Sequence, residues 1–242
     1  MMLGKIHSLE TMGLVDGPGI RVVVFLQGCA LRCQFCHNPD TWATEGGEEM
    51  SPQELLQKIV RYRPYFTRSS GGVTFSGGEP LLQPEFVLET LKLCREARIH
   101  TCLDTAGCGR GMYDEILQYT DLVLYDVKQI TEESYRQMTG RDWTETGKFL
   151  QAVRRAGTPV WVRHVVVPGL TDGEAHMAAL QSFVHAHVPN VQKVELLPYH
   201  LLGVHKYEVM GLKYPLTGVP AMDIGKVEQW QKKYFAVGET RR

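Results

Sequence analysis

Six short runs of apolar and β-branched residues recur along almost the whole chain, and they limit its possible folds more than any other feature. Several are almost continuously apolar, as strands buried on both faces of a sheet are. The runs span residues 21–27, 72–76, 101–105, 121–128, 159–169 and 193–200.

Helical patterns separate these runs. The first, residues 51–63, begins with Ser51 as the N-cap, Pro52 as the first helical residue and Glu54 completing a capping box. Further helices are expected at 84–97, 111–119, 144–157, 174–188 and 223–235.

Alternating strands and helices form parallel βα units with right-handed crossovers. Six such units are too few to close an eight-stranded barrel. The predicted fold class is therefore α/β, an open, partial (β/α)6 barrel of parallel strands with outer helices, and a doubly wound sheet is the second possibility. No linker, repeat or low-complexity segment divides the chain, so we expect a single domain over residues 1–242.

The overall charge and hydropathy exclude several classes of protein. The formal net charge is −1, which argues against a nucleic-acid binder or a protein held at anionic membranes. No apolar run approaches the roughly 20 residues that span a bilayer, and the start of the chain lacks the apolar stretch of a secretory signal. We expect a cytoplasmic protein that binds neither nucleic acid nor membrane.

Residues that are unusual for a buried sheet gather at or near the carboxyl ends of the predicted strands. Because active sites of parallel α/β folds form at the carboxyl ends of their strands, these residues are candidate site residues. They are the cysteines after the first strand, Gly77, Gly78 and Glu79 after the second, Asp104 and Thr105, Asp126 and Lys128, Arg163, and His200.

Three cysteines lie within eight residues, as Cys29, Cys33 and Cys36 in the spacing C-x3-C-x2-C. One possibility is a structural zinc site with His37 as the fourth ligand. The other is a 4Fe–4S cluster, in which three thiolates leave one iron open for another ligand. The scattered Cys94, Cys102 and Cys108 are expected to be small buried residues.

The cysteine loop, together with the Gly-Gly-Glu-Pro loop after the second strand, resembles the radical S-adenosylmethionine (SAM) superfamily. The similarity covers nearly the whole chain and is closest to the family that activates pyruvate formate-lyase. It is carried by the segments DGPGIR, CHNPDTW, SGGEP, LDT, DVKQ, VVVPG and ELLPYH.

The resemblance implies a cluster whose open iron is chelated by the amino and carboxylate groups of SAM. One electron from the reduced cluster would cleave the S–C5′ bond of SAM. The 5′-deoxyadenosyl radical would then take a hydrogen atom from a glycine of the partner enzyme. The cofactor carries this chemistry and the protein positions it.

The resemblance also assigns ligands. Cys29, Cys33 and Cys36 would hold the cluster. A monovalent cation, Na⁺ or K⁺, would be bound by Asp104 and Asp126, with Thr105 and the Leu124 carbonyl assisting. The residues expected to contact SAM are Phe35, Cys36, His37, Gly77, Gly78, Glu79, Asp126, Val127, Lys128, Arg163 and His200.

The expected partner is pyruvate formate-lyase, whose glycine loop would contact Asp16 of the DGPGIR segment and Arg163. The 40 residues between Cys36 and Gly77 contain no cysteine, so only one cluster is implied. The electron donor would be of the flavodoxin or ferredoxin type, and the chain is expected to act as a monomer. The alternatives are activation of another glycyl radical enzyme and, in a different class, a zinc-stabilised binding module without catalysis.

Overall fold

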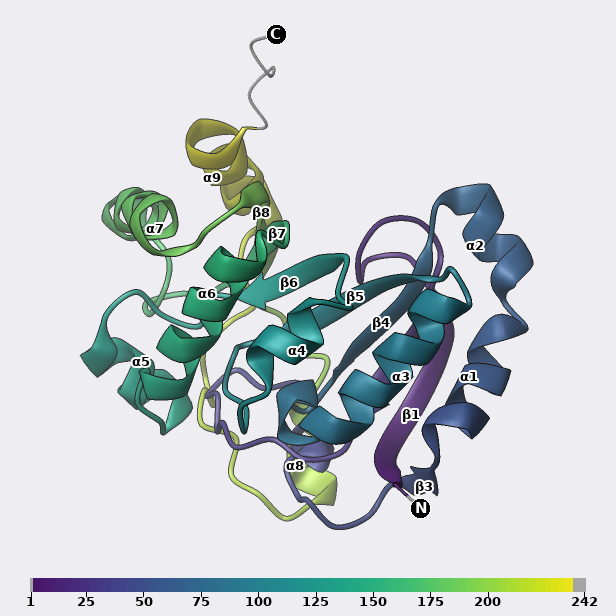
Figure 1. Cartoon of the computed structure of the whole chain (residues 1–242). Coiled ribbons are helices and arrows are strands. Elements are labelled where there is room, and N and C mark those ends of the chain that lie inside the picture. The colour runs from purple at the N-terminus through teal and green to yellow at the C-terminus, as the bar shows by residue number, and fades with distance from the viewer. Residues whose placement is uncertain (1, 237–242) are drawn as a thin grey trace, which may run out of the picture.

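The computed structural model describes residues 2–236, which form one eight-stranded sheet with helices outside it (Figure 1). Six strands are parallel and adjacent, as predicted. They are β2 (Arg21–Leu26), β4 (Gly72–Gly77), β5 (His100–Thr105), β6 (Leu122–Asp126), β7 (Val160–Val166) and β8 (Val191–Pro198). The predicted partial barrel is confirmed.

Two further strands extend one edge of the sheet and were not predicted. β1 (Gly4–Gly13) pairs antiparallel with β2, and the short β3 (Glu48–Met50) pairs antiparallel with β1. Along β1 buried and more exposed residues alternate, since one face of this strand is open. A search for continuous apolar runs therefore misses it.

The predicted helices are all present, and the Ser51–Glu54 capping box of the first is formed. They are α1 (Pro52–Val60), α3 (Pro84–Glu96), α4 (Tyr113–Leu117), α6 (Thr144–Ala156), α7 (Glu174–His187) and α9 (Ile224–Phe235). The structure adds α2 (Arg63–Ser69), α5 (Glu132–Thr139) and α8 (Val204–Val209), which are short. No helix among residues 2–236 is long and apolar enough to cross a membrane.

The segment before β2 is held in place by Arg21. This side chain is fully buried, and its guanidinium donates to Thr74 Oγ1 at 2.6 Å and to the Pro18 carbonyl at 3.0 Å. Thr74 Oγ1 in turn donates to the Asp16 carbonyl at 2.6 Å. These bonds fix the Asp-Gly-Pro-Gly turn so that Asp16 reaches the residues at the carboxyl ends of the strands.

Candidate active site

A cavity of about 310 Å³ lies at the carboxyl ends of the parallel strands. Most of the predicted site residues line it, although they come from six separate segments of the chain. Those lining residues are Asp16, Cys29, Cys33, Phe35, Cys36, His37, Gly77, Gly78, Glu79, Asp104, Thr105, Asp126, Lys128 and Arg163.

The cysteine loop follows β2 and is held by main-chain hydrogen bonds to a distant part of the chain. The Arg32 amide donates to the Thr139 carbonyl at 2.7 Å, and the Gln34 amide to the Met138 carbonyl at 3.0 Å. The end of α5, which the sequence did not predict, therefore supports the loop that carries the three thiols.

The three thiols line the same cavity in a largely buried environment. Burial raises the pKa of Cys33 to about 12, and burial likewise raises the pKa of Cys29 and Cys36. Thiolates form here only with nearby positive charge, which the irons of a cluster provide. Among residues 2–236, no three Cys, His, Asp or Glu side chains lie close enough together to hold a single metal ion, and this includes the three thiols of the cysteine loop.

Gly77 and Gly78 pack directly against the root of the cysteine loop. A Cβ at Gly77 would lie 2.3 Å from the Leu26 amide nitrogen, and one at Gly78 would lie 2.2 Å from the Gly28 carbonyl oxygen. Gly77 also has a φ of 110°, a value that favours glycine. The glycines thus allow β4 and the cysteine loop to approach closely, in addition to lining the cavity.

Glu79 is buried and all its interactions are with the protein. Its carboxylate accepts hydrogen bonds from Thr105 Oγ1 at 2.5 Å, the Leu81 amide at 3.2 Å and the Ala106 amide at 3.0 Å. Burial raises its pKa to about 7, although these donors favour the ionised form. Glu79 therefore joins the loop after β4 to the loop after β5.

Arg163 projects from β7 into a group of carboxylates. Its guanidinium nitrogens lie 3.5 Å from Asp104 Oδ1, 3.7 Å from Asp16 Oδ1 and 3.6 Å from Glu195 Oε2, and it donates to the Val15 carbonyl. Burial alone would lower the pKa of Arg163, but these acids raise it above its ordinary value. The cation is therefore permanent and holds the Val15–Asp16 segment beside β5 and β7.

Two buried atoms in this group lack a hydrogen-bond partner within residues 2–236. They are Asp104 Oδ1 and Arg163 Nε. Asp104 Oδ2 accepts from Ser76 Oγ at 2.6 Å, and burial raises the Asp104 pKa to about 6 although Arg163 lowers it. Unpaired buried polar atoms at a cavity wall fit a charged group bound inside it.

Asp126 and Lys128 form an ion pair at the end of β6. Lys128 Nζ lies 2.8 Å from Asp126 Oδ2 and 5.6 Å from the centre of the Phe35 ring. Burial opposes the charge on Lys128, but the Asp126 carboxylate raises its pKa above the usual value. A fixed cation thus stands between the cysteine loop and the strand-end carboxylates.

Three of the predicted site residues do not line this cavity. Leu124 is fully buried in the sheet. The main chain of Val127 is occupied, since its amide donates to the Arg163 carbonyl at 2.9 Å and its carbonyl lies 2.7 Å from His164 Nδ1. His200 is exposed, but its ring stacks on His37 with the ring centres 4.0 Å apart, so it lies immediately behind the cavity wall.

Residue-level reasoning missed three supporting side chains. Glu195 is a charge within an apolar strand, the same signal that identified Arg163. His164 is buried, and its Nε2 lies 3.0 Å from the Nε2 of His176. The helical pattern that carries His176, His185 and His187 contains no partner motif and predicts all three at the surface; this is wrong for His176, which is half-buried, whereas His185 and His187 are exposed.

Comparison with known proteins gives concordant matches. The model of the radical SAM superfamily matches residues 23–180. A pyruvate formate-lyase-activating enzyme from Clostridium pasteurianum is 55% identical over 232 residues, which cover 96% of this chain and 97% of the relative. One from Listeria monocytogenes is 44% identical over 91% of each chain.

Solved structures support the fold. The crystal structure of a domain of pyruvate-formate lyase-activating enzyme from Bacteroides vulgatus matches with a TM-score of 0.53 and 24% identity. The match covers 67% of this chain and 91% of that domain.

Proposed function

The chain belongs to the pyruvate formate-lyase-activating enzymes of the radical SAM superfamily, and we propose that it activates pyruvate formate-lyase in the cavity above its parallel strands. One observation supports placing this activity in the cavity. The three thiols of one loop and the carboxylates of neighbouring strand ends line a single cavity, although they are far apart in the sequence.

The family implies a 4Fe–4S cluster and SAM, and the chain offers residues suited to both. Cys29, Cys33 and Cys36 would hold three irons. When bound, the cluster and SAM supply a 5′-deoxyadenosyl radical that takes a hydrogen atom from a partner glycine. Every other task, namely binding, orientation and exclusion of water, falls to the protein.

The residues around the thiols are suited to holding SAM. Phe35 and His37 present rings at the cavity wall, and Gly77 and Gly78 present main chain there. Lys128 and Arg163 supply fixed positive charge for a carboxylate. His200 would act through its stack on His37, Val127 through its place between Asp126 and Lys128, and Glu79 by keeping the glycine loop in position.

We further infer that a monovalent cation, Na⁺ or K⁺, binds beside Asp104 and Asp126. Asp104 Oδ1 accepts no hydrogen bond within residues 2–236, which supports this, because oxygen ligands suit a hard cation. The contribution of Thr105 is smaller, since its hydroxyl donates to Glu79 and accepts from the Gly107 amide at 2.8 Å. Leu124 would contribute only its carbonyl.

Asp104→Asn is expected to weaken SAM binding and to remove its dependence on a monovalent cation. The loss should be on the order of 1–3 kcal/mol, as for a removed charged partner. Calorimetric titration with SAM across a Na⁺ and K⁺ series measures it. The matched control is Asp114→Asn, at an exposed position. If the wild-type protein binds SAM with the same affinity at every Na⁺ and K⁺ concentration, the cation site is contradicted.

The partner's glycine loop would enter along the Val15–Asp16 segment. Arg163 fixes this segment by donating to the Val15 carbonyl and lying beside the Asp16 carboxylate. Leu14 and Val15 are exposed, at 71% and 78%, and offer apolar contact to an incoming peptide. Pyruvate formate-lyase is the partner that the relatives indicate, and a flavodoxin- or ferredoxin-type protein would supply the electron to a monomeric enzyme.

Mixing the reduced, cluster-loaded protein with SAM and pyruvate formate-lyase should produce an organic radical on the partner. Electron paramagnetic resonance detects that radical, and chromatography detects 5′-deoxyadenosine. A partner in which the loop glycine is replaced by alanine is the control. Formation of 5′-deoxyadenosine without any radical on the natural partner would point to a different glycyl radical enzyme.

A further inference from the structure

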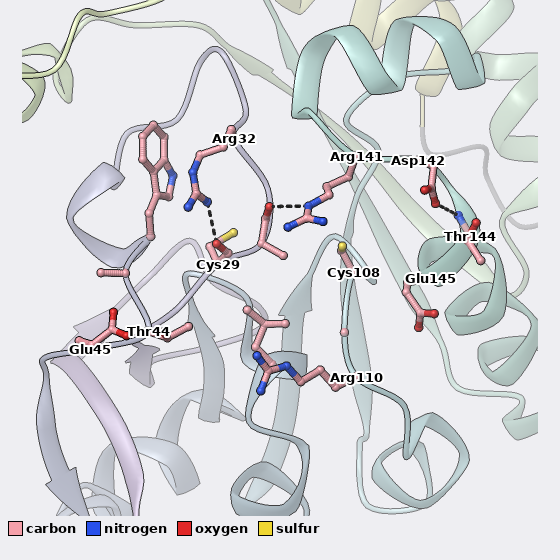
Figure 2. Close-up of a pocket in the computed structure, with 15 residues that line it drawn as sticks. Cys29, Arg32, Thr44, Glu45, Cys108, Arg110, Arg141, Asp142, Thr144 and Glu145 are labelled. Atoms are coloured by element: carbon pink, nitrogen blue, oxygen red, sulfur yellow. Dashed lines mark hydrogen bonds between the residues drawn. The ribbon is translucent and has the colours of Figure 1, made fainter.

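A second, larger cavity of about 730 Å³ lies on the other side of the cysteine loop (Figure 2). It is bordered by the loop itself, by residues 108–110 after β5 and by the start of α6. Among the described residues, Cys29 is the one that lines both cavities. A cluster held by Cys29 would therefore be approached from two sides.

Three arginines surround this second cavity, and two of them hold the cysteine loop. Arg32 donates to the Cys29 and Leu31 carbonyls, each at 2.8 Å, and its guanidinium lies 4.8 Å from the Trp42 ring centre. Arg141 donates to the Ala30 carbonyl at 3.1 Å. Figure 2 shows both side chains directed at the loop, with Arg110 on the wall below them.

The surface around the cavity offers unpaired positive charge. Arg32, Arg110 and Arg141 are exposed, and within residues 2–236 none of them forms an ion pair. Lys5 adds a further cation in an adjoining cavity that shares Arg110.

The carboxylates around the same cavity are largely engaged. Glu145 accepts from Tyr113 at 2.7 Å and pairs with Lys148, and Asp142 accepts from the Thr144 amide at 3.0 Å. Glu45 alone among the lining acids has no such partner within the part of the chain that the structure describes. When Lys148 and Lys5 are counted, five cations face three carboxylates around this cavity, on a chain whose net charge is −1.

We propose that this arginine-lined cavity is the docking surface of the electron donor, and that the donor is a protein that presents an acidic patch. The inference rests on the proposed function, which requires one electron per reaction. That electron leaves the donor's redox group, which is oxidised, and reduces the cluster, with no bond made or broken in either protein. Because SAM and the glycine loop would fill the first cavity, the electron needs a separate approach, and Cys29 provides it.

The expected complex is transient and electrostatic. Electron-transfer complexes are at the small end of protein interfaces, and charge complementarity sets their association rate more than their final affinity. Salt therefore weakens such a complex strongly, since it screens exposed charges. Trp42, which lines the cavity and stacks under the Arg32 guanidinium, adds an aromatic surface.

Arg110→Glu is the cleanest test, because the Arg110 side chain forms none of the hydrogen bonds that hold the cysteine loop. The probe is a flavodoxin of net negative charge. Its dissociation constant is measured with the cluster-free and the cluster-loaded protein at low and high salt. We expect at least a tenfold weaker complex at low salt, a difference that salt reduces, and near-wild-type binding for Arg110→Lys.

The matched control is Arg61→Glu, an equal charge change at an exposed residue after α1. It should bind the flavodoxin within twofold of wild type. Equal binding by Arg110→Glu and Arg61→Glu would overturn the proposal, as would an Arg110→Glu defect confined to binding of pyruvate formate-lyase. Rapid-mixing reduction of the cluster gives a second reading, and the flavodoxin-driven rate should fall relative to the dithionite-driven rate in Arg110→Glu.

A different result would contradict the proposed function, namely that the dithionite-reduced wild-type protein does not cleave SAM. Binding of flavodoxin to the cluster-free protein is measured without SAM cleavage, so the two proposals can fail separately.

Discussion

Replacing Cys33 by alanine is expected to abolish both the iron–sulfur cluster and the reductive cleavage of SAM. Cys33 lies in the middle of the cysteine loop and is the most buried of its three cysteines, and the nearby Lys128 favours its thiolate. The substitution removes one of the three protein ligands of the cluster. Within residues 2–236, no cysteine outside the cysteine loop lines the first cavity and could replace it. Iron and sulfide analysis, visible absorption and 5′-deoxyadenosine formation measure the loss.

Cys94→Ala is the matched control, because Cys94 is a fully buried cysteine on α3, away from the cavity. It should retain about four irons per chain, the number in a 4Fe–4S cluster, together with full cleavage of SAM. A Cys33→Ala protein that keeps its cluster would show that the loop does not hold it.

Replacing Arg163 by methionine should destabilise the protein by about 3–5 kcal/mol, as removal of one partner from a buried ion pair does. The substitution leaves Asp16, Asp104 and Glu195 without the cation that lies within 3.7 Å of each. Transfer of hydrogen from the partner should be lost as well, because the Val15–Asp16 segment loses its anchor. Urea unfolding of the cluster-free protein measures the stability, and Arg163→Lys should lose less.

The defect should depend on pH in a defined direction. The folded-state pKa of Asp104 is already raised to about 6, so its ionisation costs native stability as pH rises through that range. Without Arg163 the pKa rises further, and the deficit of the variant should shrink when pH is lowered from about 7 to about 5. Arg155→Met, which breaks an exposed pair with Asp114, should change little at either pH. A methionine variant as stable as wild type at pH 7 would contradict the account.

The core strands could be predicted from sequence because they are buried on both faces and therefore read as continuous apolar runs. β1 lacks that signal, since one of its faces is open. α5 is only eight residues long and mostly polar, yet Tyr135, Met138 and Thr139 bury one side of it. Local signals for it were nevertheless present and were overlooked, since Thr131 caps its N-terminus and Gly140 ends it in the left-handed conformation.

The site was predictable where a residue type is unusual for its position. Closely spaced cysteines, paired glycines and an arginine within an apolar strand all stand out. Glu195 met the same criterion and was overlooked. His164 could not be assigned, because its role depends on a contact with the Val127 carbonyl, 37 residues earlier in the chain.

The geometry also changes the explanation of one motif. The sequence suggests that Gly77 and Gly78 admit a ligand. In the structure a Cβ at either would first strike the main chain of β2 or of the cysteine loop. These glycines therefore align the loops that form the cavity, and only main-chain coordinates reveal this.

The central claim is that this cavity brings a partner glycine to the 5′ carbon derived from SAM. Its most direct measurement uses pyruvate formate-lyase whose glycines carry deuterium at Cα, mixed with the reduced protein and unlabelled SAM, followed by mass spectrometry of 5′-deoxyadenosine. We predict one deuterium in the 5′-deoxyadenosine formed with the natural partner and none with a partner in which alanine replaces the loop glycine. Release of 5′-deoxyadenosine without deuterium, at the same rate with either partner, would show that glycine is not the hydrogen donor and would contradict the account.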